Sequence, residues 1–182
     1  MESKVCQSEF LVLRNAFNRK IAKADVLSRE EVIIDNFNDI CLRASKDDPV
    51  AQDFLAYCFK KGVRDVIPVN WEKYMQWQIL AGANGNEFAI DKLALFFNYA
   101  FNEIMLADDL EYIIQRNDIT KDNFTYVVGR LLCEAMADDM MLSPEKLLKE
   151  KITSVEFNAK LMRTFDRSRN YAIPKVLKFL RN

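Results

Sequence analysis

The chain has 182 residues, a length that fits one domain, and its 50% hydrophobic and 29% charged residues are ordinary for a folded protein. It contains no histidine, which excludes Cys/His zinc sites, Ser-His and Cys-His nucleophile pairs, and the usual acid–base catalyst near neutral pH. The formal net charge is only −1, and no apolar run approaches the roughly 20 residues that cross a bilayer, so we expect a cytoplasmic protein without a membrane span.

Apolar residues recur at helical spacing along almost the whole chain, and no strand-like alternation of any length is present. The first predicted helix covers residues 2–24. Ser28 and Glu31 have the spacing of a capping box, which predicts a second helix that begins there and ends near Ser45. The expected fold class is therefore all-α.

Two further helices follow, each with a recognisable start and end. Asp48 precedes Pro49, a pair that caps and starts a helix, and Gly62 supplies the left-handed residue that ends it. A second amphipathic helix begins near Trp71 and ends at Gly85. Its apolar face contains Trp71, Tyr74, Met75, Trp77, Leu80 and Ala81.

The second half of the chain continues the helical pattern. A helix that begins after Gly85 runs on through Phe101, and another follows at 106–114. Residues 124–137 are apolar nearly all round, which predicts a central helix. Shorter helices are expected to start at Ser143–Pro144, at a Thr153–Glu156 capping box and at Pro174.

Two segments of the chain repeat each other at an offset of 38 residues. Residues 51–59 and 89–97 share the pattern Ala-x-Asp-x-Leu-Ala-x-x-Phe, five identities in nine positions. Ala, Leu and Phe fall on one helical face, where the small Ala admits a neighbouring helix and the larger pair fills the space beside it. Leu131 lies 38 residues beyond Leu93, which makes 124–137 a candidate third copy. Such a period is typical of helical-repeat proteins.

This unit of helix, turn and helix resembles the Sel-one-like repeat family, a relative of the tetratricopeptide repeats. The family pattern has Ala, Leu-Gly and an aromatic in the first helix, Gly in the turn, then Lys-Ala, Trp, Ala-Ala and a final Gly. Here Ala56 stands for the usual Gly, Tyr74 stands for Ala, and the turn 63–69 is two residues longer. The corresponding residues are Ala51, Leu55, Ala56, Phe59, Gly62, Lys73, Tyr74, Trp77, Ala81, Gly82 and Gly85.

The resemblance covers about a third of the chain and implies a short α-α superhelix. We expect one helical-repeat domain over residues 1–182, with a clear repeat core at 36–101, less regular C-terminal helices at 102–182, and extra capping helices at both the N- and the C-terminal end. The resemblance also implies a non-enzymatic adaptor that holds another protein or peptide, without a cofactor. Trp77 takes a packing position of the family, so we expect it in the core, whereas Trp71 suits either packing or a ligand.

Signals of catalysis are weak in this chain. Ser143 and Lys146 match the S-x-x-K motif of penicillin-binding enzymes, but the accompanying S-D-N and K-T-G elements are absent, and Ser143 before Pro144 is better explained as a helix N-cap. The adjacent acids Asp108–Asp109 and Asp138–Asp139 point about 100° apart on a helix, so neither pair converges on one metal ion. The four glycines fit no phosphate-binding loop. We expect no catalytic, cofactor or metal site.

Side chains of the first helices that lie outside the packing pattern would line the inner surface of a superhelix. Asp53 and Asp91 recur at the same place, which predicts either a small acidic ladder for a basic peptide or carboxylates that are solvated or hydrogen-bonded locally. The predicted partner-binding residues are Asp53, Tyr57, Lys60, Trp71, Asp91, Leu95 and Asn98.

Charge is unevenly distributed along the chain. Residues 1–142 carry 16 basic and 23 acidic side chains, a net charge of −7, whereas residues 143–182 carry 10 basic and 4 acidic ones, a net charge of +6. The basic region is either a surface for nucleic acid or another anionic partner, or a polar-faced cap on the stack of helices. Capping is favoured, because no aromatic residue is regularly interleaved with the basic ones for base stacking.

The cysteines are scattered and form no C-x-x-C pair. Three of the four lie in apolar helical patterns, where a reduced thiol behaves as a small hydrophobic group. We therefore expect buried free thiols rather than disulfides or metal ligands at Cys6, Cys41, Cys58 and Cys133.

Overall fold

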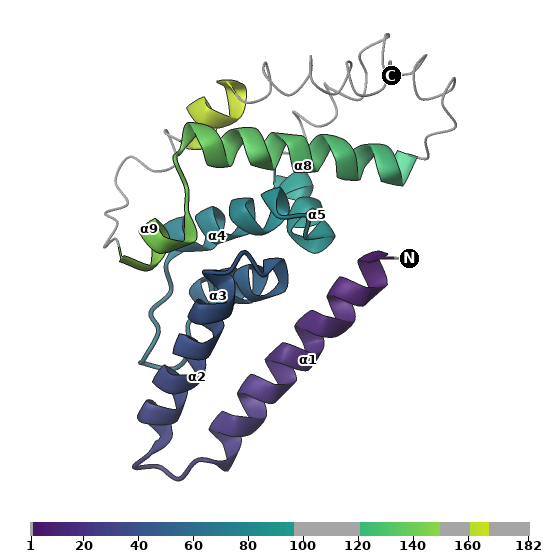
Figure 1. Ribbon diagram of the computed structural model, residues 1–182. Coiled ribbons are helices and arrows are strands. Elements are labelled where there is room, and N and C mark those ends of the chain that lie inside the picture. The colour runs from purple at the N-terminus through teal and green to yellow at the C-terminus, as the bar shows by residue number, and fades with distance from the viewer. Residues whose placement is uncertain (1, 97–120, 150–160, 168–182) are drawn as a thin grey trace.

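The computed structural model describes residues 2–96, 121–149 and 161–167 (Figure 1). Within these ranges the fold is all-α, as predicted, and the only strand-like feature is an isolated bridge between Val63 and Ile67. In chain order the helices are α1 Glu2–Lys23, α2 Arg29–Ala44, α3 Pro49–Lys61, α4 Trp71–Ala83, α5 Glu87–Phe96, α8 Lys121–Asp139 and α9 Pro144–Lys149, and residues 161–167 are also helical. None of the described helices combines the length and apolarity that crossing a membrane requires.

Helix α4 lies at the centre of the described structure. It packs against α3, α5, α8 and α9, and Figure 1 shows α8 lying across α4 and α5. Helices α1 and α2 form a hairpin at the other end, and α1 packs against both α2 and α3. The side chain of Trp77 is 0% exposed, as predicted, and Met75 and Ile79 of the same helix are also buried. An apolar helix that contacts neighbours on several sides leaves little surface for water.

The starts of α3 and α5 are capped at equivalent positions. The Asp48 carboxylate accepts hydrogen bonds from the backbone N–H groups of Val50 and Ala51, both at 3.0 Å, which confirms the predicted cap. The Asn86 side-chain oxygen accepts one from the backbone N–H of Ala89, also at 3.0 Å. Asp48 and Asn86 are 38 residues apart, so the offset found in the sequence extends to the residues that cap the two helices.

Buried amides join the turn before α5 to the start of α3. The Asn86 side-chain nitrogen donates to the Pro49 carbonyl at 3.0 Å. Gln52, which is 0% exposed, donates to the Ala44 carbonyl at 3.1 Å and accepts from the Asn84 side chain at 3.0 Å. These bonds satisfy polar groups that would be costly to bury alone, and they fix how α5 follows α3 in space.

The ends of α3 and α4 follow the sequence prediction. Gly62 ends α3 with φ 71°, and Gly85 follows α4 with φ 88°, both in the left-handed region that favours glycine. The backbone N–H of Asn70 donates to the Phe59 carbonyl at 2.8 Å, which returns the loop to the end of α3. Asn70 then caps α4 by accepting from the backbone N–H of Lys73 at 2.9 Å.

The capping box predicted at Ser28 is wrong, although α2 begins where expected. Ser28 has helical dihedral angles and its side chain caps no backbone N–H of α2. Its hydroxyl instead donates to the Asp25 carboxylate at 2.9 Å, which also accepts from the backbone N–H groups of Leu27 and Ser28. The helical dihedral angles of Ser28 explain the missing cap, because a residue whose side chain caps a helix usually has an extended backbone.

In the second half, the predicted central helix at 124–137 lies within α8, and α9 begins at Pro144 as expected. The backbone N–H of Lys146 lies 3.3 Å from the Ser143 hydroxyl oxygen, which confirms the predicted N-cap. Several other predictions lie outside the described residues. These are the extension through Phe101, the helix at 106–114, the Thr153–Glu156 capping box and the helix from Pro174.

Replacement of the two tryptophans by alanine tests the placement of α4. Trp77→Ala should lower the free energy of unfolding by about 3–5 kcal/mol, because it empties a buried site. Trp71 is 42% exposed and rests on the Tyr74 ring, so Trp71→Ala removes a side chain that is already partly in water and should cost about half as much as Trp77→Ala. Urea denaturation measures both, and equal small losses would contradict the register of α4.

A glycine tests the contact between α4 and α8. A Cβ placed on Gly82 would lie 2.6 Å from the Cys133 sulfur. Gly82→Ala should therefore destabilise the protein by about 1–3 kcal/mol through overpacking. In a Cys133→Ala background the same change should cost little, because the sulfur is gone and alanine favours the helix by up to about 1 kcal/mol. A double-mutant cycle by urea denaturation measures the coupling, and additive effects would contradict this packing.

Candidate functional site

Asp53 lies in the interior, not on an exposed inner surface. Asp53 is 1% exposed, and its carboxylate accepts one hydrogen bond from Lys92 Nζ at 2.6 Å and another from Gln78 Nε2 at 2.8 Å. Asp91, the equivalent residue 38 positions later, is exposed. The two carboxylates therefore form no ladder on one surface. Asp53 is also neither solvated nor hydrogen-bonded locally, because its two donors lie 25 and 39 residues further along the chain.

The ion pair of Asp53 with Lys92 holds several helices together. Asp53 comes from α3, Gln78 from α4 and Lys92 from α5. Lys92 Nζ also lies 5.4 Å from the centre of the Phe10 ring of α1, a cation–π contact. One charged donor, Lys92, and one neutral donor, Gln78, offset the cost of burying the Asp53 carboxylate. Because both bind the same carboxylate oxygen, that oxygen is not available to a partner.

Lys60 and Trp71 lie together on the face formed by α3 and α4. Lys60 Nζ lies 5.0 Å from the centre of the Tyr74 ring, and the rings of Trp71 and Tyr74 are 5.0 Å apart. The two predicted residues therefore meet at a third aromatic side chain. Lys73 lies over the neighbouring Phe59 ring at 5.2 Å, so the cationic and apolar groups of this face are already packed on each other.

The other predicted residues lie elsewhere. Tyr57 turns toward α1, where its ring is 5.8 Å from Phe10 and 6.1 Å from Phe54. Asp91 and Leu95 are exposed on α5, and the leucine is 77% exposed. Asn98 lies outside the described residues. The structure thus joins Lys60 with Trp71 but does not bring the predicted set onto one surface.

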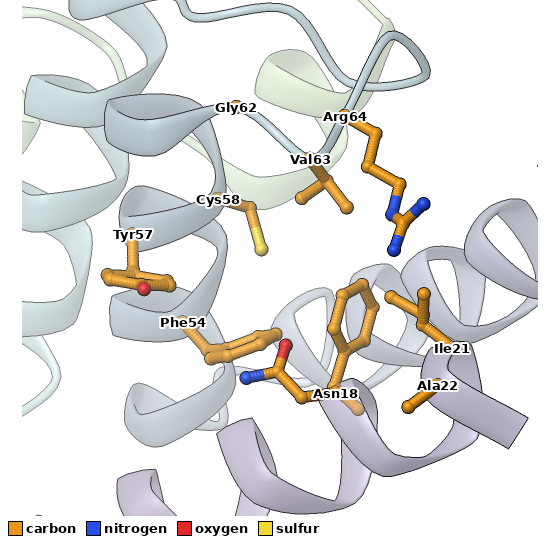
Figure 2. Close-up of a pocket in the computed structure, with 10 residues that line it drawn as sticks. Asn18, Ile21, Ala22, Phe54, Tyr57, Cys58, Gly62, Val63 and Arg64 are labelled. Carbon is orange, nitrogen blue, oxygen red and sulfur yellow. The ribbon is translucent and has the colours of Figure 1, made fainter.

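A cavity between α1, the second half of α3 and the turn after it is a better candidate site (Figure 2). Its volume is about 350 Å³, within the range of small ligand pockets. Figure 2 shows the Phe54 ring, the Cys58 sulfur and Val63 directed toward it from one side, with Ile21 and Ala22 of α1 on the other. The lining residues are Phe17, Asn18, Ile21, Ala22, Phe54, Tyr57, Cys58, Gly62, Val63 and Arg64.

The interior of this cavity is apolar and its edge is polar. Phe17, Phe54 and Cys58 are buried, whereas Asn18 and Arg64 are exposed and Tyr57 is half-buried. In Figure 2 the Arg64 side chain extends from the turn across the opening toward α1. Arg64 has φ 49°, so its backbone is in the left-handed region that a non-glycine residue adopts at some cost.

Sequence reasoning selected one lining residue, Tyr57, and missed the cavity itself. Because the helix before the repeat core is expected to be a cap, the sequence pattern assigns no binding role to the residues of α1. A weak signal was present: Asn18 and Ala22 interrupt the apolar face of α1 one turn apart, beside Phe17 and Ile21. Small or polar residues beside an apolar face indicate that the partner helix does not close on it there.

The described residues offer no acid–base or metal chemistry at this cavity. Its lining contains no carboxylate. No group of three or more His, Cys, Asp or Glu side chains is placed to hold a metal ion anywhere in the described ranges. Cys58 and Cys133 are buried free thiols, as predicted. Cys41 is also a free thiol but is only half-buried, and the side chain of Cys6 lies outside the described residues.

Burial makes these thiols unreactive. It raises the pKa of Cys58 to about 12, with a smaller contribution from Cys41, and it raises the pKa of Cys133 to about 12. Burial also raises the pKa of Cys41 to about 11, although Lys73 acts in the opposite direction. Because the thiolate is the nucleophile, thiol chemistry at neutral pH is disfavoured at all three.

Comparison with known proteins identified no relative: no protein-family model, no curated protein and no solved structure matches the chain.

Alkaline pH should destabilise the protein through these thiols. A thiol whose pKa is raised from 9.0 in the unfolded chain to about 12 in the folded one stabilises the fold fully below pH 9 and progressively less between pH 9 and pH 12. Between pH 8 and pH 10 the parent protein should therefore lose about 1 kcal/mol more of its unfolding free energy than Cys58→Ala does. Urea denaturation at the two pH values measures this, and identical losses would contradict the burial of a neutral thiol.

Proposed function

We propose that this chain is a non-enzymatic interaction module of the helical-repeat type, which holds another protein or peptide. The observation that carries the proposal is the offset of 38 residues, which relates the apolar patterns of α3 and α5 and also their capping residues Asp48 and Asn86. Leu55 and Leu93, equivalent in the two copies, are both buried. Repeated units that pack side by side create surfaces for binding rather than a closed catalytic pocket.

The proposal includes the family and the architecture. A Sel-one-like repeat would place α3 and α4 as one unit and α5 as the first helix of the next, in a short superhelix. The succession of contacts from α3 to α4 and from α4 to α5 fits this arrangement. The proposal also includes a cytoplasmic location, where free thiols such as Cys41, Cys58 and Cys133 are the rule.

The described part of the basic C-terminal region favours the capping role over nucleic-acid binding. Thr164 donates to the Asp139 carboxylate at 2.8 Å, and Arg167 lies 3.8 Å from it. Leu161 and Phe165 of the same segment are buried. This segment is therefore packed at the end of α8, and one of its cations already faces a carboxylate.

A peptide library tests the proposed function. Panning of random peptides against the immobilised full-length chain should enrich a family of sequences that bind it with roughly micromolar affinity in solution. The urea-unfolded chain serves as the control and should enrich none of them. Absence of any enriched family would contradict the proposal. Binding of a labelled single-stranded RNA that weakens steeply with salt would favour the nucleic-acid alternative instead.

A further inference from the structure

We propose that the cavity between α1 and α3 is the binding site for an acidic segment of a partner protein, which inserts a large apolar side chain and places carboxylates against a basic rim. This inference rests on the proposed function and names the site and the chemistry of its partner. We use the name α1–α3 groove for the cavity with its lining residue Arg64 and for the two cations that lie one helical turn from lining residues, Arg14 and Lys61.

The shape and walls of the groove suit one anchoring side chain. Phe54 forms the floor, with ring centres 5.3 Å from Phe17 and 5.8 Å from Phe10. These edge-to-face contacts hold the aromatic walls in fixed positions. The volume of about 350 Å³ is at the lower end of ligand pockets and suits one or two apolar side chains rather than a whole cofactor. Insertion of one large side chain into such a pocket is how interfaces gain most of their affinity.

The charge around the opening is positive. On α1, Arg14 lies one turn before Asn18, which lines the cavity, so both are on the same face of the helix. On α3, Lys61 lies one turn after Tyr57, which also lines it. Arg64 reaches the opening from the turn (Figure 2). The groove therefore receives a cation from each of the three segments that form it.

These cations are available to a partner. None of Arg14, Lys61 and Arg64 forms an ion pair in the described part of the chain, unlike Arg43 and Lys92. Three carboxylates lie near the groove in the sequence. Asp25 is engaged by the turn before α2, Asp53 is paired with Lys92, and the exposed Asp65 follows Arg64. One free carboxylate against three cations leaves a surplus of positive charge, which selects an acidic partner.

The edge of the cavity also offers unused hydrogen-bonding groups. Neither the Asn18 amide nor the Tyr57 hydroxyl has a hydrogen-bond partner among the residues that the structure describes. Both are at the rim, where a peptide backbone or carboxylate would pass after its apolar side chain enters. Apolar walls with a few polar groups at the opening are the usual composition of a site that recognises one orientation of its ligand.

A second cavity on the other side of α1 provides the contrast. Its volume is about 210 Å³, and it is lined by residues of both charges: Lys20 and Arg43 are accompanied by Asp39. Arg43 is already paired with Asp48 at 2.6 Å. This cavity is smaller and has no surplus charge, so the acidic partner is expected at the α1–α3 groove alone.

Two variants remove the two parts of the groove separately. Ala22→Phe fills the cavity from an exposed position on α1, and Arg64→Glu reverses the charge at its opening. Each has a matched control: Ala16→Phe adds the same ring at an exposed position beside the second cavity, and Arg19→Glu makes the same charge change at an exposed position of α1 that lines neither cavity. Thermal unfolding followed by circular dichroism verifies that all four variants are folded.

The probe is a fluorescein-labelled synthetic peptide with a central Leu-Phe pair flanked by glutamates. Two comparison peptides carry lysines in place of the glutamates, or alanines in place of Leu-Phe. Fluorescence anisotropy should show binding of the first peptide to the full-length chain, and binding of each comparison peptide at least about tenfold weaker. Ala22→Phe and Arg64→Glu should each weaken the first peptide about tenfold, whereas Ala16→Phe and Arg19→Glu should change its affinity less than about threefold.

Several results would overturn the inference. Equal effects of the groove variants and their controls would mean that binding is non-specific or occurs elsewhere. Absence of binding by the glutamate peptide, while library-selected peptides bind all variants equally, would reject the groove and leave the interaction module in place. Absence of any peptide binding would reject both. Salt-sensitive binding of a single-stranded RNA that the two groove variants abolish would identify the occupant as nucleic acid.

Discussion

The described structure depends on the burial of α4. This helix presents apolar side chains to α3 on one side and to α5 and α8 on others, and its Trp77 is among the largest fully buried side chains. The burial of this tryptophan depends on helices packing against α4, since a lone helix exposes its side chains to water. The close approach of α8 then requires a residue without a side chain at Gly82, where any Cβ would meet the sulfur of Cys133.

Polar groups in the interior determine how the helices are ordered around α4. Asp53 binds both Gln78 and Lys92, and Gln52 and Asn86 join the turns at the starts of α3 and α5. A buried polar group with no partner costs free energy, so arrangements that leave these groups unpaired are disfavoured. Apolar packing supplies the driving force for folding, whereas these bonds select one arrangement of the helices among several that bury similar area.

The distribution of apolar and polar residues also explains why the α1–α3 groove is open. Helix α1 is held against α3 at Phe10 and Phe17, but Asn18 and Ala22 supply no large apolar group to fill the space beside Phe54 and Cys58. The cavity is thus a consequence of small and polar residues at one edge of an otherwise apolar interface. Because the cations around it have no carboxylate partner within the described ranges, this edge is suited to a partner that the chain itself does not supply.

The sequence by itself determined the all-α fold, most of the helix boundaries and the burial of Trp77. These follow from local chemistry: Asp48 accepts from the N–H groups that follow it, Gly62 adopts a left-handed conformation, and apolar spacing identifies the inner faces. Only the tertiary structure decided the environment of Asp53, because its partners Gln78 and Lys92 lie 25 and 39 residues further along the chain. The cavity was likewise undetermined, because its walls come from separate segments whose distance depends on packing.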